Sequence, residues 1–89
     1  MSAPYRVHVV DAVRGLDGLL MPTTTLLGIY STREAAQRAA AQLIRDGTCR
    51  STEVRQRTLL LDSFVLRGER TPAHVYRHVT RAVQRTLEV

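Results

Sequence analysis

The C-terminal part of the chain carries the residues with the clearest chemical character. At about 100° per helical residue, its basic side chains would occupy roughly a third of the circumference, with only Glu88 intruding. This stripe predicts contact with nucleic-acid phosphates or with an acidic partner protein. The alternative is the solvated outer face of an arginine-rich protein. The stripe consists of His74, Arg77, His78, Arg81 and Arg85.

Two more arginines, Arg55 and Arg57, would extend this basic surface if they lie on the same molecular face as the stripe. A continuous patch would favour binding to phosphates, because each neutralised phosphate adds a favourable electrostatic contribution. A stripe that is isolated, or neutralised by Glu69 and Glu88, would instead favour a role in protein interaction.

We predict no metal site and no cofactor. His74 and His78 stand four residues apart, a spacing that can chelate zinc, but zinc needs a third and usually a fourth ligand. The remaining candidates, His8 and Cys49, are distant in sequence, and the neighbouring arginines would repel a dication.

The sequence also predicts no enzyme and no catalytic residues. Cys49 lies in a loop without the local signature of a thiol enzyme. No two carboxylates are paired at an acid–base spacing, and Gly15 and Gly18 flank a turn without the helix that a phosphate-binding loop requires.

The charge balance indicates an anionic partner or a GC-rich genome. Thirteen basic residues face eight acidic ones in 89 residues, and every basic residue is arginine, whose rigid fork of donors suits carboxylate and phosphate. Eight of the arginines lie from Arg50 onward. GC-rich codons also favour arginine over lysine. As part of the expected function, we expect a bacterial or phage protein.

Length and composition favour a single cytoplasmic domain over residues 1–89. The chain is 44% apolar and 24% charged, which is typical of a globular domain. We expect no membrane association, because no apolar run approaches the roughly 18 residues that cross a bilayer and no secretory signal is recognisable. The single cysteine fits a reducing compartment.

Two strands are predicted near the N-terminus. Residues 5–13 alternate between apolar and polar positions, as expected for a half-buried strand. Asp17 and Gly18 suit a hairpin turn, and a second strand is predicted over 24–30, with Pro22 marking an edge or a bulge.

A helix is predicted after Ser31. The Ser31-Thr32-Arg33-Glu34 segment has the pattern of a capping box, and Asp46-Gly47 supplies a C-terminal stop. Helical spacing predicts an inner face rich in short side chains: Ala36, Ala39, Ala40, Leu43 and Ile44.

The second half is predicted to contain one strand and one helix. Residues 53–66 form a long extended segment with a bend or bulge at Asp62-Ser63, and Thr71-Pro72 caps a helix over 73–87. The predicted fold is therefore α+β, in the order β-β-α-β-α. A three-stranded, mainly antiparallel sheet carries both helices on one face, with the first strand in the middle.

Two helices on one face would leave the other face of the sheet open. Arg6, His8 and Val10 would lie there, joined by apolar residues of the other strands. Exposed apolar surface of that size is unusual for a monomer, so we predict a homodimer or a bound protein partner, unless a loop covers the face. Two functions remain: a non-enzymatic protein-interaction module acting as a homodimer, or a small basic nucleic-acid-associated protein using the C-terminal helix.

Overall fold

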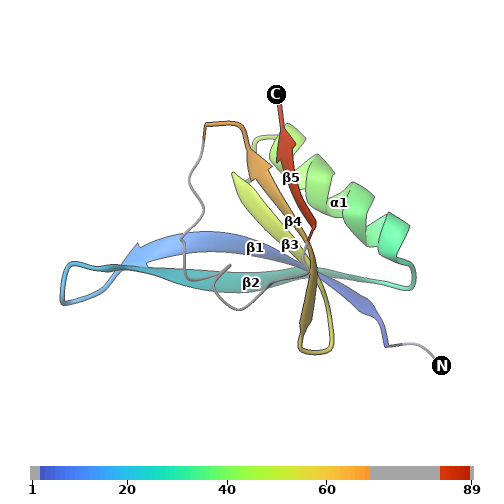
Figure 1. Cartoon of the computed structure of the whole chain (residues 1–89), viewed down its shortest axis with the longest axis horizontal. Coiled ribbons are helices and arrows are strands. Elements are labelled where there is room, and N and C mark those ends of the chain that lie inside the picture. The colour runs from blue at the N-terminus through green and yellow to red at the C-terminus, as the bar shows by residue number, and fades with distance from the viewer. Residues whose placement is uncertain (1–2, 69–82, 89) are drawn as a thin grey trace.

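A five-stranded mixed sheet with one helix packed on it forms the described part of the chain (Figure 1). The structure is a computed structural model that describes residues 3–68 and 83–88. The strands lie in the order β2-β1-β3-β4-β5, and only β4 and β5 pair in parallel. The elements are β1 (Tyr5–Arg14), β2 (Leu20–Tyr30), α1 (Arg33–Arg45), β3 (Ser51–Gln56), β4 (Leu59–Leu66) and β5 (Val83–Leu87).

This architecture shows that the predicted fold of three strands and two helices is wrong. The described residues contain five strands and one helix. The predicted central position of the first strand is confirmed, since β1 lies between β2 and β3 and runs antiparallel to both. One additional strand arises because the segment predicted as a single strand over 53–66 belongs to two strands, β3 and β4. The other is β5, which lies at the end of the predicted C-terminal helix.

The β1–β2 hairpin is longer than predicted. β2 begins at Leu20 rather than at residue 24, and it contains Pro22, whose missing N–H is tolerated because β2 is an edge strand. Gly18 takes the positive φ of 79° that the turn requires. β3 pairs with β1 only as far as Val9, so the distal half of the hairpin extends past it (Figure 1).

The segment predicted as one extended strand over 53–66 is a second hairpin. The chain reverses after β3, with Arg57 in the left-handed region at a φ of 56°. No glycine or proline marks this turn, which is why sequence reasoning missed it. The bulge in β4 falls at Leu61 rather than at Asp62-Ser63, because Val54 lies opposite Asp62 whereas Arg55 lies opposite Leu60.

The last five residues of the predicted C-terminal helix form strand β5. Val83 lies opposite Asp62 and Leu87 opposite Leu66 in a parallel pairing with β4. Pairing with a distant strand outweighs the helical spacing of this segment, whose β-branched Val83 and Thr86 suit a strand. The rest of that prediction, residues 69–82, lies outside the described residues.

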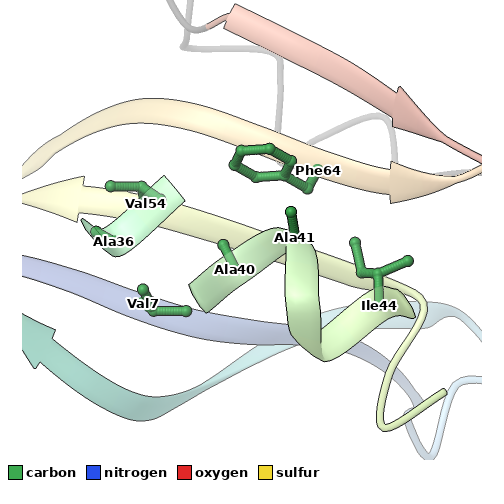
Figure 2. Packing of buried hydrophobic residues seen from close by; sticks show 7 residues of the cluster. All are labelled: Val7, Ala36, Ala40, Ala41, Ile44, Val54 and Phe64. Carbon is green, nitrogen blue, oxygen red and sulfur yellow. The ribbon is translucent and has the colours of Figure 1, made fainter. Parts of the chain in front are cut away.

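The core lies between α1 and the sheet and is built on short side chains. Thr52 on β3 lies beneath the helix and donates a hydrogen bond from Oγ1 to the carbonyl oxygen of Ala40, at 3.0 Å. Three alanines allow the helix to approach this closely. The predicted inner face is nearly right, except that Ala41 is buried while Ala39 and Leu43 are only partly buried. Figure 2 shows the buried cluster: Val7, Ala36, Ala40, Ala41, Ile44, Val54 and Phe64.

Both ends of α1 have identifiable caps. The N-cap is Thr32 rather than the predicted Ser31, and its Oγ1 accepts from the backbone N–H of Ala35 at 3.2 Å. At the other end the N–H of Asp46 bonds to the carbonyl of Gln42, and Gly47 takes a φ of 77° as predicted.

The sheet face opposite α1 is only in part the open apolar surface that we expected. Val10, Glu53, Ser63 and Val65 are all buried. On the β1–β2 hairpin, however, Leu26 and Ile29 lie on this face, opposite His8 and Arg6, and both are exposed.

Candidate functional site

The β1–β2 hairpin carries most of the exposed apolar surface. Of the nine large hydrophobic side chains that are exposed among the described residues, seven belong to it, which makes this concentration a feature of one element rather than scatter. Leu27, the residue inserted at the β-bulge in β2, is 50% exposed. We call these residues the hairpin surface: Val13, Leu16, Leu19, Met21, Leu26, Leu27 and Ile29.

The outer edge of β2 is suited to pairing with another strand. None of its eleven residues is charged, although charged residues are a usual means of blocking an edge. The N–H of Gly15 donates to the carbonyl of Leu19 at 2.8 Å, which fixes the alternation of hydrogen-bonded pairs along the hairpin. By this alternation Thr24 directs its N–H outward, away from β1, and the nitrogen of Pro22 points the same way.

A hollow of about 310 Å³ lies between α1 and β2 beside this edge. Its lining is mainly apolar and includes Val7, Leu27 and Leu43, while Gln42 and Asp46 supply polar groups. A Cβ at Gly28 would lie 2.8 Å from the Tyr30 ring, so a larger residue there would displace that ring. Leu27 belongs both to the hairpin surface and to the lining of this hollow.

A polar cluster lies on the sheet face opposite α1. Glu53 on β3 is fully buried, with His8 opposite it on β1 and Ser63 opposite it on β4. Arg55 forms an ion pair with Glu53 at 2.8 Å. Burial, together with the nearby positive charge of Arg55, lowers the pKa of His8, so its imidazole is held neutral.

The order of these groups does not match a nucleophilic triad. In a Ser-His-acid relay the histidine stands between the hydroxyl and the carboxylate, whereas here Glu53 stands between His8 and Ser63. The cluster therefore serves to neutralise a buried carboxylate. His8 Nδ1 and Ser51 Oγ are buried without a hydrogen-bond partner among the described residues.

A second buried carboxylate, Asp62 on β4, faces the helix. Arg33 binds it with two prongs, Nε to Oδ2 at 3.0 Å and Nη2 to Oδ1 at 3.1 Å. The amide nitrogen of Gln37 donates to the same Oδ1 at 3.1 Å. The hydrogen bonds to Asp62 raise the pKa of Arg33 further above its ordinary value, so this guanidinium group stays protonated.

The residues of the predicted basic stripe are placed as follows. His74, Arg77, His78 and Arg81 lie outside the described residues. Arg85 lies on β5, on the face that α1 covers, with its guanidinium carbon 5.9 Å from the centre of the Phe64 ring. Its Nε is 3.8 Å from Asp62 Oδ1.

The two other predicted arginines are not brought next to Arg85. Arg55 lies beside Glu53 on the opposite face of the sheet, and Arg57 lies in the β3–β4 turn. The structure thus separates Arg55 from Arg85 by the thickness of the sheet, while the role of each in binding stays a prediction.

Sequence reasoning missed the edge of β2 as a candidate site. Its signal was an absence: residues 20–30 contain no charged side chain, in a protein in which 24% of all residues are charged. Sequence reasoning also did not select Arg38 and Arg45 of α1 as candidate site residues.

The described residues bear on three further possibilities: a reactive thiol, a metal site and a membrane-spanning helix. Burial raises the pKa of the Cys49 thiol, which disfavours the reactive thiolate. No group of three His, Cys, Asp or Glu residues in ranges 3–68 and 83–88 is arranged to hold a metal ion. In the same ranges, no helix has the length and apolar character needed to span a membrane.

Comparisons with protein-family models, with curated proteins and with solved structures found no match.

Proposed function

We propose that this chain is a non-enzymatic protein-interaction module that acts as a homodimer paired along the outer edge of β2. The observation that carries the proposal is the uncharged edge of β2, which lies within the hairpin surface. An edge strand presents unpaired N–H and C=O groups and readily adds a further strand.

A second copy of the chain is the partner that fits this edge best. The protein carries a formal charge of +5, so two copies repel one another over most of their surfaces. Pairing two β2 strands antiparallel about a two-fold axis brings only uncharged residues together. The edge strand on the other side of the sheet, β5, is shorter and contains Arg85, so self-pairing there would bring like charges together.

The composition supports the setting of this function. The lysine-free, arginine-rich sequence supports a bacterial or phage origin, and the single cysteine supports a cytoplasmic location.

The test is the oligomeric state of the full chain, measured by sedimentation over a wide concentration range. Leu26→Lys places a charge on the paired edge and is expected to give a monomer, since the two introduced ammonium groups would repel each other. Leu59→Lys is the matched control, because Leu59 is also exposed, at 62%, but lies at the β3–β4 hairpin. This control is expected to remain a dimer.

Thr24→Pro provides a second, independent test. It removes an outward N–H while leaving the β1–β2 ladder intact, as the natural Pro22 does. The expected result is a monomer with an unchanged far-ultraviolet circular dichroism spectrum. A wild-type chain that stays monomeric at all concentrations, or a dimer disrupted by Leu59→Lys but not by Leu26→Lys, would overturn the proposal.

A further inference from the structure

A second hollow lies between α1 and β5, with a volume of about 280 Å³. We call it the α1–β5 hollow. Among the described residues, its charged lining consists of Arg38 and Arg45 from the helix, Arg85 from the strand and one acid, Glu34. Three guanidinium groups from two elements that are distant in sequence therefore surround one concave surface, against one carboxylate.

The two helix arginines lie on the same side of α1. They are seven residues apart, which is close to two turns and about 10.5 Å along the axis. Ala41, the lining residue between them, is small and leaves the hollow open. Neither guanidinium group forms a hydrogen bond or an ion pair with another residue in ranges 3–68 and 83–88.

Arg85 is positioned by contacts with buried residues, and its guanidinium group can still bind a ligand. Its guanidinium group lies over the ring of the buried Phe64, and Asp62 is 3.8 Å away. The carboxylate of Asp62 is already bound by both prongs of Arg33, so it only partly offsets the charge of Arg85. The side chain of Arg85 is 47% exposed and its donors can reach a ligand.

We propose that the α1–β5 hollow binds successive phosphate groups of a nucleic-acid strand. Arginine presents a planar fork of donors that matches phosphate geometry. Among the described residues, the forks of Arg38 and Arg45 have no other partner, and that of Arg85 has only the 3.8 Å contact with Asp62. Arg38 and Arg45 are about 10.5 Å apart along the helix axis, a length over which a nucleic-acid strand presents more than one phosphate.

The shape of the hollow favours an extended ligand over a small one. Sites for small molecules enclose most of the ligand surface, whereas the α1–β5 hollow is open to solvent along one side. An extended polyanion can contact all three arginines without being enclosed. The site does not depend on pairing along β2, because it lies at the opposite end of the sheet.

The experiment measures binding of a labelled mixed-sequence single-stranded DNA, a duplex DNA and an RNA by fluorescence anisotropy. Three phosphate contacts predict that the association constant falls roughly 20- to 40-fold between about 50 mM and about 200 mM salt. Arg38→Ala with Arg45→Ala leaves one contact and should reduce this fall to roughly threefold. Alanine preserves the helix, so the circular dichroism spectrum should not change.

The matched control removes two arginines elsewhere, Arg6→Ala with Arg14→Ala, which lowers the net charge equally. Both are exposed residues of β1, at the other side of the molecule from β5. The control is expected to keep the salt dependence of the wild type. Glu34→Gln removes the one acid that lines the hollow among residues 3–68 and 83–88 and should tighten binding at low salt.

Three results would overturn the proposal. The first is an absence of binding by the wild-type chain at low salt. The second is an equal loss in the Arg6 and Arg14 control, which would show that only diffuse net charge matters. The third is binding of polyglutamate as tightly as nucleic acid, which would show a site for an acidic protein partner. The monomeric Leu26→Lys variant should bind each of the three nucleic acids as the wild type does. Failure of the homodimer proposal can therefore be distinguished from failure of this one.

Discussion

Arg33 of α1 and Asp62 of β4 join the helix to the sheet through a two-pronged ion pair, with Nε 3.0 Å from Oδ2. The two partners differ in exposure, because the side chain of Asp62 is fully buried whereas that of Arg33 is 38% exposed. The pair is therefore asymmetric. Removing Arg33 leaves the buried carboxylate of Asp62 without its main partner, whereas removing the carboxylate leaves a guanidinium group that can reach water.

This asymmetry predicts unequal costs of substitution. Arg33→Ala should lower the free energy of unfolding by about 3 kcal/mol, because Asp62 keeps only Gln37 and the more distant Arg85. Asp62→Asn should cost about 1 kcal/mol, since Arg33 can turn toward water. Urea unfolding measures both. The control Arg38→Ala, on the same helix but without a partner among the described residues, should change stability by less than about 0.5 kcal/mol.

The helix start predicts a contrast between two neighbouring hydroxyl residues. Thr32→Ala removes the oxygen that accepts from the Ala35 N–H and should cost about 1 kcal/mol of stability. Ser31→Ala should have almost no effect, because Ser31 is not the N-cap. Equal losses of stability in Thr32→Ala and Ser31→Ala, measured by thermal unfolding, would indicate that Ser31 also caps the helix, as the sequence pattern predicted.

His8 predicts a dependence of stability on pH. Burial and Arg55 lower its folded-state pKa below the ordinary value of 6.5, although Glu53 acts in the opposite direction. The unfolded chain then binds a proton more readily, so stability falls as the pH drops below about 6.5 and levels off below the folded-state pKa. His8→Gln should remove this slope in urea midpoints measured between about pH 5 and 8. A slope unchanged in His8→Gln would assign the effect to the carboxylates.

The β3–β4 turn predicts a stabilising substitution. Arg57 adopts a φ of 56°, a conformation that disfavours residues with a Cβ but is tolerated by asparagine. Arg57→Asn should therefore raise the free energy of unfolding by about 0.5 kcal/mol. Thr58→Gly is the control: this residue has no positive φ, so glycine there should destabilise by about 0.5 kcal/mol. A loss of stability in Arg57→Asn would contradict the assignment of strain.

The parts of the fold that sequence reasoning predicted correctly rest on local signals. The period-two alternation of 5–13 and the Asp17-Gly18 turn located the first hairpin, and Gly47 located the end of α1. Each of these signals acts within a few residues of the structure that it specifies, so no knowledge of distant partners was needed.

The parts that were predicted incorrectly depend on distant or atypical contacts. The segment 83–87 has helical spacing, yet it pairs with β4 about twenty residues earlier in the chain. The turn at Arg57 lacks the glycine, asparagine or proline that usually marks a reversal. Local pattern could not reveal either feature, because tertiary pairing decides between helix and strand.

The candidate sites were only partly visible in the sequence. Arg85 was selected for its place in a helical stripe, but the structure gives it neighbours from α1 that no spacing argument joins to it. Exposure on the hairpin could be inferred only once β2 was known to be an edge strand. Sequence can supply the charges and apolar residues, and strand order decides which of them share a surface.

The alanine-rich contact between α1 and the sheet has a consequence for the thermodynamics of unfolding. Alanines supply three of the seven residues in the buried cluster, so little apolar area is exposed when the domain unfolds. The heat-capacity change and the urea m-value should both be small for a chain of this length. The stability curve is then broad and shallow, and the protein should keep a nearly constant free energy of unfolding over a wide range of temperature.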